Sequence, residues 1–162
     1  MRTIVGVMGG AIASETTLAV AEELGRGIAE RGWVLLTGGR NAGIMAAASR
    51  GAAGVGGLVA GVLPGESPAG AAPHVDIAIC TGMGDARNVI NVLSSHVVVA
   101  LPGGAGTLSE IALALKAGRT VIALGFPLGS AFSAYHERGQ LLDAVTVPET
   151  LGLIAGALGS MP

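Results

Sequence analysis

The chain has 162 residues and a mass of 15.8 kDa, a length typical of one domain with a substantial core. Hydrophobic residues make up 51% of it and charged residues 12%, the opposite of the balance found in disordered chains. With a net charge of −2 and 2% aromatic residues, we expect neither the basic surface nor the stacking platforms of nucleic-acid-binding proteins. The single cysteine, Cys80, excludes a disulfide framework and a Cys-rich metal site.

Mean hydropathy is +0.67, but the longest uncharged stretches, 51–65, 88–109 and 120–136, are interrupted by Gly, Pro or polar residues. We therefore expect no membrane-spanning helix and no membrane partner. Residues 1–14 resemble a miniature signal peptide, but they are fewer than the ~15–30 residues that such peptides need. The sequence predicts a cytoplasmic protein whose apolar excess serves a buried sheet and a subunit interface, in a homodimer or homotetramer.

Short apolar runs alternate with helical patterns along the chain. Strands are expected at 3–8, 33–37, 58–63, 75–80, 96–101, 120–124 and 144–147, and helices at 15–31, 43–53, 85–93, 107–117 and 148–158. Ser14 is the expected N-cap of the first helix. This alternation predicts a single domain over 1–162, a doubly wound α/β sandwich with a mainly parallel sheet whose strands are buried. Such sheets bind ligands at the carboxyl ends of their strands.

Three glycine clusters each follow an expected strand and precede an expected helix. They are Gly6-Val7-Met8-Gly9-Gly10, Thr37-Gly38-Gly39-Arg40-Asn41-Ala42-Gly43, and Pro102-Gly103-Gly104-Ala105-Gly106-Thr107. Glycine permits positive φ and a close approach of backbone N–H groups to an anion, and the helix that follows adds its positive end. Tight strand–helix turns would explain any one cluster, whereas three at one sheet edge favour a phosphate site. None matches G-x-G-x-x-G or G-x-x-x-x-G-K-[ST], which disfavours NAD dehydrogenases and P-loop NTPases.

The run Pro102-Gly103-Gly104-Ala105-Gly106-Thr107-Leu108-Ser109-Glu110 resembles the PGGxGTxxE signature of the LOG-like proteins. Thr37-Gly38-Gly39…Gly43-Ile44-Met45 resembles their second glycine motif, and the resemblance covers nearly the whole chain in order. It implies a Rossmann-like oligomer that binds phosphates of the nucleotide type. Some branches are cytokinin riboside monophosphate phosphoribohydrolases, which release ribose 5-phosphate, and another comprises compact molybdenum cofactor carrier proteins.

The hydrolases carry a Met-x-x-Arg-Lys pattern before the strand that leads to the signature, with its Arg and the signature Glu as catalytic groups. This chain reads Met83-Gly84-Asp85-Ala86-Arg87-Asn88, so the Arg comes one position later and Asn88 replaces the Lys. The run Arg87-Asn88-x-x-Asn91-x-x-Ser94-Ser95 is more similar to the carrier branch. The resemblance thus favours a carrier or storage protein for the molybdenum cofactor (molybdopterin), with molybdoenzymes or cofactor-insertion proteins as partners. The phosphoribohydrolase is the alternative, in which Arg87 and Glu110 would be catalytic.

Several of these residues have a local explanation as well. Thr107 and Glu110 match the S/T-x-x-E capping box, so Glu110 either caps a helix or contacts the ligand. Arg87 is expected at a helix start, where the dipole disfavours a cation unless an anion pairs with it. That anion is either the ligand or Asp85, which is also a candidate N-cap. Arg40 either meets the ligand or is solvated.

The predicted ligand is a small phosphorylated molecule, and no metal site made by protein side chains is expected because His, Cys and carboxylates are not clustered. The predicted ligand-binding residues are Gly9, Gly10, Gly38, Gly39, Arg40, Asn41, Gly43, Arg87, Asn88, Pro102, Gly103, Gly104, Ala105, Gly106, Thr107 and Glu110.

Overall fold

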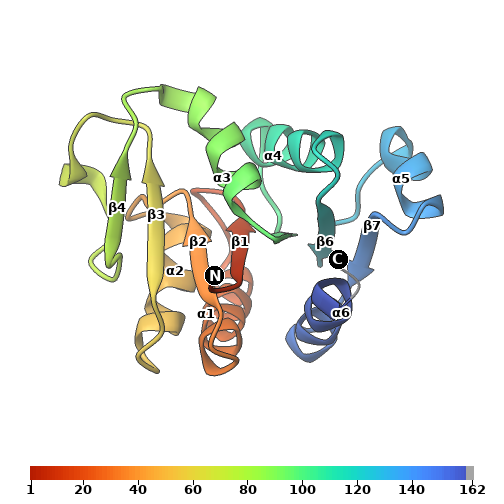
Figure 1. Ribbon diagram of the computed structural model, residues 1–162, viewed down its shortest axis with the longest axis horizontal. Coiled ribbons are helices and arrows are strands. Elements are labelled where there is room, and N and C mark those ends of the chain that lie inside the picture. The colour runs from red at the N-terminus through yellow and green to blue at the C-terminus, as the bar shows by residue number, and fades with distance from the viewer. Residues whose placement is uncertain (160–162) are drawn as a thin grey trace.

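The computed structural model describes residues 1–159, and its centre is a sheet of seven parallel strands. The strands are β1 (Ile4–Met8), β2 (Val34–Thr37), β3 (Val59–Leu63), β4 (Ile77–Cys80), β5 (Val97–Ala100), β6 (Thr120–Leu124) and β7 (Leu141–Ala144). Their order is β4-β3-β2-β1-β5-β6-β7 (Figure 1). The chain moves outward from β1 to one edge and then returns to β5 on the other side of β1. The topological switch point therefore lies between β1 and β5.

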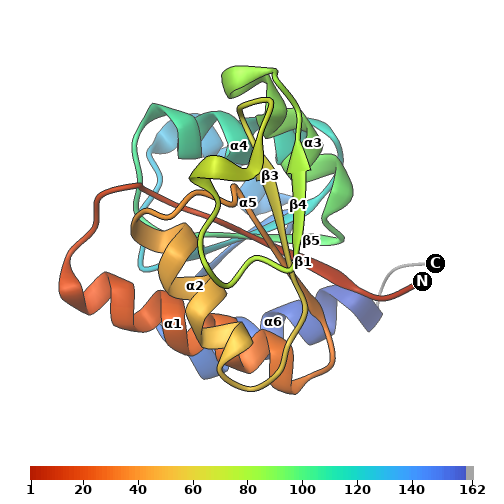
Figure 2. The ribbon, with the colours of Figure 1, turned by 90° about the vertical axis from the view of Figure 1, so that its left-hand side faces the viewer.

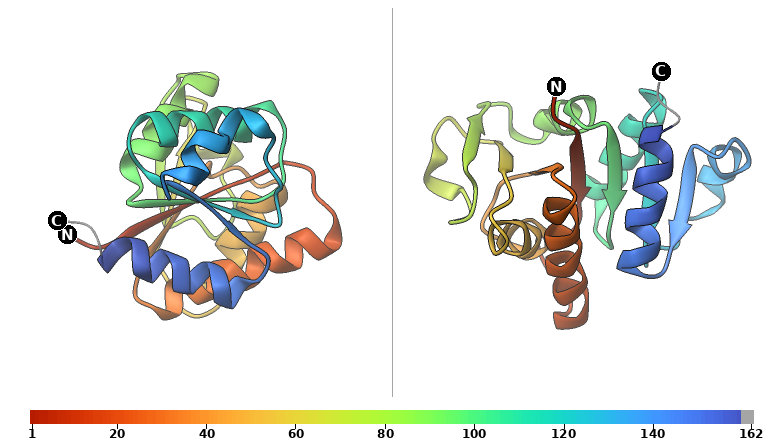
Figure 3. Two further views of the ribbon diagram at one scale, coloured as in Figure 1. Left: turned by 90° about the vertical axis from the view of Figure 1, so that its right-hand side faces the viewer. Right: turned by 60° about the horizontal axis from the view of Figure 1, so that its bottom comes forward.

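Helices cover both faces of this sheet. On one face lie α1 (Glu15–Glu30), α2 (Gly43–Ala53) and α6 (Val147–Gly159); on the other lie α3 (Asn88–Ser94), α4 (Ala105–Lys116) and the short α5 (Ser133–Glu137). The two helical layers are visible below and above the sheet in Figure 2, and from the β7 side in the left panel of Figure 3. Three short 3-10 helices complete the elements: η1 (Pro68–Gly70), η2 (Gly84–Arg87) and η3 (Ser130–Phe132). The predicted doubly wound, Rossmann-like α/β class is confirmed, with a sheet that is wholly parallel.

Side chains alternate between two hydrophobic cores, as the period-two geometry of a strand requires. In β5, Val97 and Val99 pack into the core under α1, α2 and α6, whereas Val98 and Ala100 pack under α3 and α4. Both faces of the central strands are thus apolar, which accounts for the near-continuous apolar runs in the sequence. Among the described residues, no helix combines the length and the apolar character needed to cross a bilayer.

Glycines let α1 and α2 pack backbone against backbone. A Cβ on Gly25 would collide with the backbone of Ala48, and one on Gly51 would collide with the backbone of Glu22. Each helix therefore presents a glycine where the backbone of the other approaches it. Ser14 caps α1 as expected, accepting a hydrogen bond from the Thr17 N–H at 3.2 Å.

The last strand and helix differ from the expectation. The strand predicted at 144–147 lies at Leu141–Ala144, because Asp143 interrupts the apolar pattern but is tolerated on this edge strand. Thr146 instead begins α6: its Oγ1 accepts a hydrogen bond from the Glu149 N–H at 3.3 Å, and Glu149 accepts one from the Val145 N–H at 2.9 Å. The pair Thr146–Glu149 therefore caps this helix in a variant of the capping box, in which Glu149 accepts from the residue before Thr146 rather than from Thr146 itself.

The predicted capping box at Thr107–Glu110 is wrong, because α4 begins at Ala105 with Gly104 as its N-cap. Thr107 thus lies inside the first turn. Asp85 is likewise not an N-cap: it sits within η2, and α3 starts only at Asn88. The strand at 75–80, expected to be buried, is the exposed edge strand β4, and its Cys80 is exposed.

Candidate functional site

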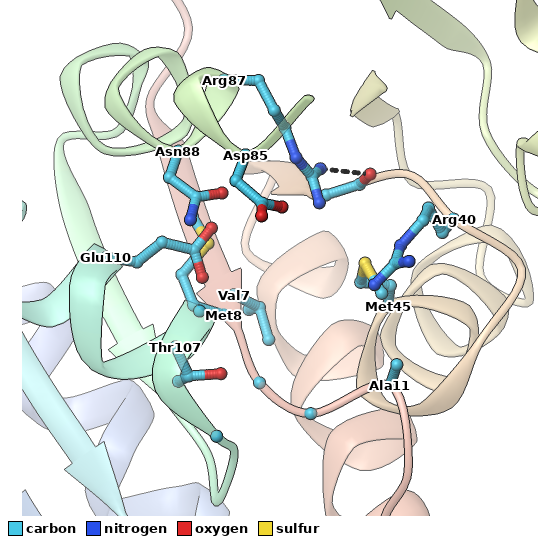
Figure 4. Close-up of a pocket in the computed structure, with 15 residues that line it drawn as sticks. Val7, Met8, Ala11, Arg40, Met45, Asp85, Arg87, Asn88, Thr107 and Glu110 are labelled. Atoms are coloured by element: carbon cyan, nitrogen blue, oxygen red, sulfur yellow. Dashed lines mark hydrogen bonds between the residues drawn. The ribbon is translucent and has the colours of Figure 1, made fainter. Parts of the chain in front are cut away.

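A pocket of about 180 Å³ opens at the carboxyl ends of the central strands, next to the switch point between β1 and β5. Loops that follow β1, β2 and β5 reach it, together with η2 and the first turns of α2, α3 and α4 (Figure 4). It is lined by Val7, Met8, Gly9, Gly10, Ala11, Gly38, Arg40, Met45, Asp85, Arg87, Asn88, Gly104, Gly106, Thr107 and Glu110. This is the place where open α/β sheets bind their ligands.

The glycine loops are fastened to one another through their backbones. The Gly10 N–H donates to the Pro102 oxygen at 3.1 Å, and the Gly10 oxygen accepts from the Ile44 N–H at 3.0 Å. Gly43 adopts a φ of +48°, and a Cβ there would collide with the Gly10 oxygen. Only glycine both adopts this positive φ without strain and leaves room for the Gly10 oxygen. The loop after β1 is therefore held between the starts of α2 and α4.

Two of the helices that begin at the pocket, α2 and α4, have no side-chain cap. Gly104 precedes α4 and Ala42 precedes α2, and neither supplies a side-chain hydrogen bond to the first turn. By contrast α1, which contributes no residue to the pocket lining, is capped by Ser14. The first N–H groups of α2 and α4 lack an intrahelical acceptor, although in α2 the Ile44 N–H is bonded to the Gly10 oxygen. Both helix dipoles place positive potential at their starts. The pocket is thus suited to an anion.

The Arg87 side chain is buried and contacts backbone oxygens rather than a carboxylate. Its Nη1 donates hydrogen bonds to the oxygens of Gly38, just after β2, and of Val62, within β3. It forms no ion pair with Asp85 among residues 1–159. Burial lowers the pKa of the guanidinium, and the negative charge of Glu110 opposes this shift. Arg87 therefore joins η2 to the ends of two strands, while its Nε is buried without a partner in the described chain.

Glu110 lies on the pocket side of α4 with 7% of its surface exposed. Its Oε1 accepts a hydrogen bond from Asn91 Nδ2 on α3 at 2.7 Å. Burial raises the pKa of this carboxyl, whereas the Asn91 hydrogen bond and the charge of Arg87 act in the opposite direction. Next to it, Asn88 Nδ2 donates to Ser109 Oγ at 3.0 Å, a second polar link between α3 and α4.

The structure brings most of the predicted ligand-binding residues together in this pocket. Six do not line it but belong to the same loops as residues that do: Gly39, Asn41, Gly43, Pro102, Gly103 and Ala105. Gly39 turns the chain after β2 with φ +72°, and Pro102 supplies the oxygen that holds Gly10. These residues shape the loops whose neighbours face the cavity.

Sequence reasoning did not single out Val7, Met8, Ala11, Met45, Asp85 or Asn91 for this site. A signal for Asn91 existed, because it follows Asn88 by three residues and thus shares its helix face. Met8 and Met45 read as ordinary core residues, and only the tertiary structure shows that they line a pocket. Among residues 1–159, no three His, Cys, Asp or Glu side chains gather closely enough to hold a metal ion.

Residues 2–151 match the sequence profile of the SLOG cluster4 family, and the chain belongs to that family. The resemblance to LOG-like proteins carried by the glycine motifs is thereby confirmed.

Two solved structures are similar over almost the whole chain. The molybdenum cofactor binding protein of the phototrophic bacterium Rippkaea orientalis is 46% identical, with a TM-score of 0.91 over 98% of both chains. The molybdenum cofactor carrier protein of Chlamydomonas reinhardtii is 43% identical, with a TM-score of 0.91 over 99% of this chain and 100% of that one. An uncharacterized protein of Archaeoglobus fulgidus is 44% identical over 124 residues, 76% of this chain and 81% of that one.

Proposed function

We propose that this protein binds a small phosphorylated ligand in the pocket beside β1 and β5, and that it is a carrier or storage protein for the molybdenum cofactor. The observation that carries the first half is the convergence of two uncapped helix starts with the backbone-fastened glycine loops. The second half rests on the similarity to the proteins of Rippkaea orientalis and Chlamydomonas reinhardtii that bind or carry this cofactor.

The residues at the pocket fit such a cargo. The N–H groups of the first turn of α4, at Ala105, Gly106 and Thr107, would hold the phosphate of molybdopterin. The loop at Gly9 and Gly10, whose Gly10 N–H is bonded to Pro102, would form the wall beside it. The cavity of about 180 Å³ is smaller than the ~300 Å³ from which ordinary ligand pockets begin, so the cargo would extend through its mouth. A carrier of this kind would act in the cytoplasm and deliver its cargo to molybdoenzymes or cofactor-insertion proteins.

The phosphoribohydrolase is not favoured. That reaction would require Arg87 and Glu110 to act on the ligand, and Arg87 Nη1 already donates to two backbone oxygens. The deciding experiment incubates the purified protein with molybdopterin-type cofactor and, separately, with purine riboside monophosphates. We expect cofactor to co-elute with the protein in gel filtration and no ribose 5-phosphate above background. Robust release of ribose 5-phosphate that disappears in Glu110→Gln would overturn the carrier in favour of the hydrolase.

We further propose that the protein is a homo-oligomer, with a second copy covering the outer face of α3 and α4. Six large apolar side chains are exposed on this side, on β4, α3, α4 and the approach to η2: Ile77, Ile79, Met83, Val89, Leu93 and Leu108. Pairing of β4 with β3 places Ile79 beside the buried Val62, on the same side of the sheet as α3 and α4, but Ile79 is 42% exposed and thus not covered by these helices.

The distribution of charge supports the proposal that a second copy of this chain covers the apolar face. Helix α3 has no charged residue, and α4 has only the buried Glu110 and the terminal Lys116. Helix α1, on the opposite layer, carries an ordinary solvated face with Glu15, Glu22, Glu23, Arg26 and Glu30. A face with so little charge meets its own copy across a two-fold axis without like-charge repulsion.

A further inference from the structure

Donors and acceptors are unevenly distributed in the pocket. Backbone N–H groups gather where α2 and α4 begin, whereas the carboxylates of Asp85 and Glu110 come from η2 and α4. Figure 4 shows Asp85, Asn88 and Glu110 together toward the end formed by η2 and α3, with Thr107 and Ala11 at the opposite end. A ligand whose phosphate occupies the N–H end therefore directs its remaining part toward carboxylates.

Glu110 is the buried carboxylate of this group, whereas Asp85 is exposed to solvent, and most of the hydrogen-bonding capacity of Glu110 is unmet. An ionised carboxylate has about four acceptor positions, and Glu110 receives one hydrogen bond in the described structure, from Asn91 to Oε1. The side chain is buried, and a buried carboxylate is unfavourable unless donors surround it. The sulfur atoms of Met8 and Met45 in the same pocket donate nothing. A ligand that supplies N–H donors would satisfy this carboxylate.

We propose that Glu110 selects ligands whose ring carries two adjacent N–H donors, the 2-amino-4-oxopyrimidine edge that guanine and pterins share. A carboxylate accepts two parallel N–H bonds from this edge, as it does from a guanidinium. Adenine presents an acceptor nitrogen at the corresponding place and would leave the carboxylate unpaired. The pocket therefore takes guanine nucleotides as well as pterins. This inference rests on the proposed phosphate site, which anchors the other end of the ligand.

Asn91 is a positioning residue in this arrangement. Its side chain is fully buried, and its backbone oxygen accepts a hydrogen bond from Ser95 Oγ at 2.8 Å, which fastens the end of α3. The amide then holds Glu110 Oε1 and leaves Oε2 without a partner in the described structure. Asn91→Ala should weaken the ring preference and leave the affinity for inorganic phosphate unchanged.

The test is calorimetric titration of the purified protein with guanosine, inosine and adenosine 5′-monophosphates and with inorganic phosphate. The three nucleotides share phosphate and ribose, so differences among their affinities report the ring edge. We expect guanosine monophosphate to bind at least about 10- to 100-fold more tightly than adenosine monophosphate, the range for one of the two charged hydrogen bonds, with inosine monophosphate between them. In Glu110→Gln this preference should fall to within about threefold while phosphate affinity persists. Glu23→Gln, on the exposed side of α1, should keep the preference.

The outcomes separate the two proposals. Equal affinities for guanosine and adenosine monophosphates, or a preference that survives Glu110→Gln, would overturn the role of Glu110 and leave the phosphate site standing. Failure of all three nucleotides and of phosphate to bind would overturn the phosphate site itself. Unphosphorylated 6-hydroxymethylpterin should displace guanosine monophosphate, and failure to do so would overturn the extension to pterins.

Discussion

The side-chain amide of Asn91 and the carboxylate of Glu110 meet at 2.7 Å, joining α3 to α4 at the inner wall of the pocket. Neither side chain is exposed by more than a few per cent of its surface. The contact replaces the helix cap that the Thr107-Leu108-Ser109-Glu110 spacing suggests. Glu110 therefore forms part of the pocket wall, and its burial there raises the pKa of its carboxyl.

The free energy of unfolding should depend on pH in a way that Glu110 determines. Because burial raises its pKa above the usual 4.5, the folded state binds more protons than the unfolded state between that value and the raised one. The free energy of unfolding contributed by this group therefore falls as pH rises through the window and is constant above it. Denaturant titrations from pH 4 to pH 8 should show Glu110→Gln gaining stability relative to the wild type as pH increases. Parallel pH profiles of the two proteins would contradict the shift.

Substitutions at Arg87 and Arg40 should have different effects, because Arg87 supports the fold and Arg40 faces the ligand site. Arg87→Ala removes hydrogen bonds to two buried backbone oxygens, and we expect a loss of about 2–4 kcal/mol in the free energy of unfolding. Arg40 is exposed at the pocket rim, so Arg40→Ala should change stability by less than about 0.5 kcal/mol. The same variant should weaken phosphate binding about three- to fivefold, as expected for a solvent-exposed charge. Urea unfolding and phosphate calorimetry on both variants provide the comparison.

Gly43 and Gly56 offer a matched pair for the loop that follows β1. Both have positive φ, +48° and +74°, but only Gly43 has a neighbouring backbone where a Cβ would stand. Gly56→Ala should destabilise by about 1–2 kcal/mol through backbone strain alone. Gly43→Ala should be worse by a further 1–3 kcal/mol, roughly, and should abolish phosphate binding because the Gly10 loop must move. Thermal unfolding with and without phosphate measures both effects, and equal behaviour of the two variants would refute the close approach.

The proposed assembly should fail when charge is placed on the α3–α4 face. Leu93 on α3 is 51% exposed and Val145 after β7 is 82% exposed, so a glutamate at either position is solvated in a single chain. Leu93→Glu should yield monomers in multi-angle light scattering, because two copies of the charge would meet at the interface. Val145→Glu should keep the wild-type mass. A wild-type protein that is already monomeric at micromolar concentration would end the proposal.

The sequence predicts the interior of this fold better than its edges and better than the site chemistry. β1, β2, β3, β5 and β6 are buried on both faces, so their apolar runs are unambiguous. At β7, the solvated Asp143 is compatible with an edge strand, but the pattern alone favoured the β-branched run after it. Two T-x-x-E spacings occur, and only the one at Thr146 coincides with a helix start.

In the site, too, the sequence predicts local features better than contacts between distant segments. Glycine clusters identify the loops because their spacing is local, and the sheet topology then brings them together. The partners of Arg87 are backbone oxygens 49 and 25 residues away in the sequence, which no local pattern encodes. The contact of Asn91 with Glu110 spans 19 residues and depends on how α3 packs against α4.

The glycines at the α1–α2 crossing have a consequence for the genetics of this protein. Gly25 and Gly51 let the two helix backbones touch, and the uncapped start of α2 lies at the pocket. A side chain at either position would displace that start without altering any residue that faces the ligand. A screen for variants unable to retain phosphate should therefore recover substitutions at these two buried positions alongside those in the glycine loops.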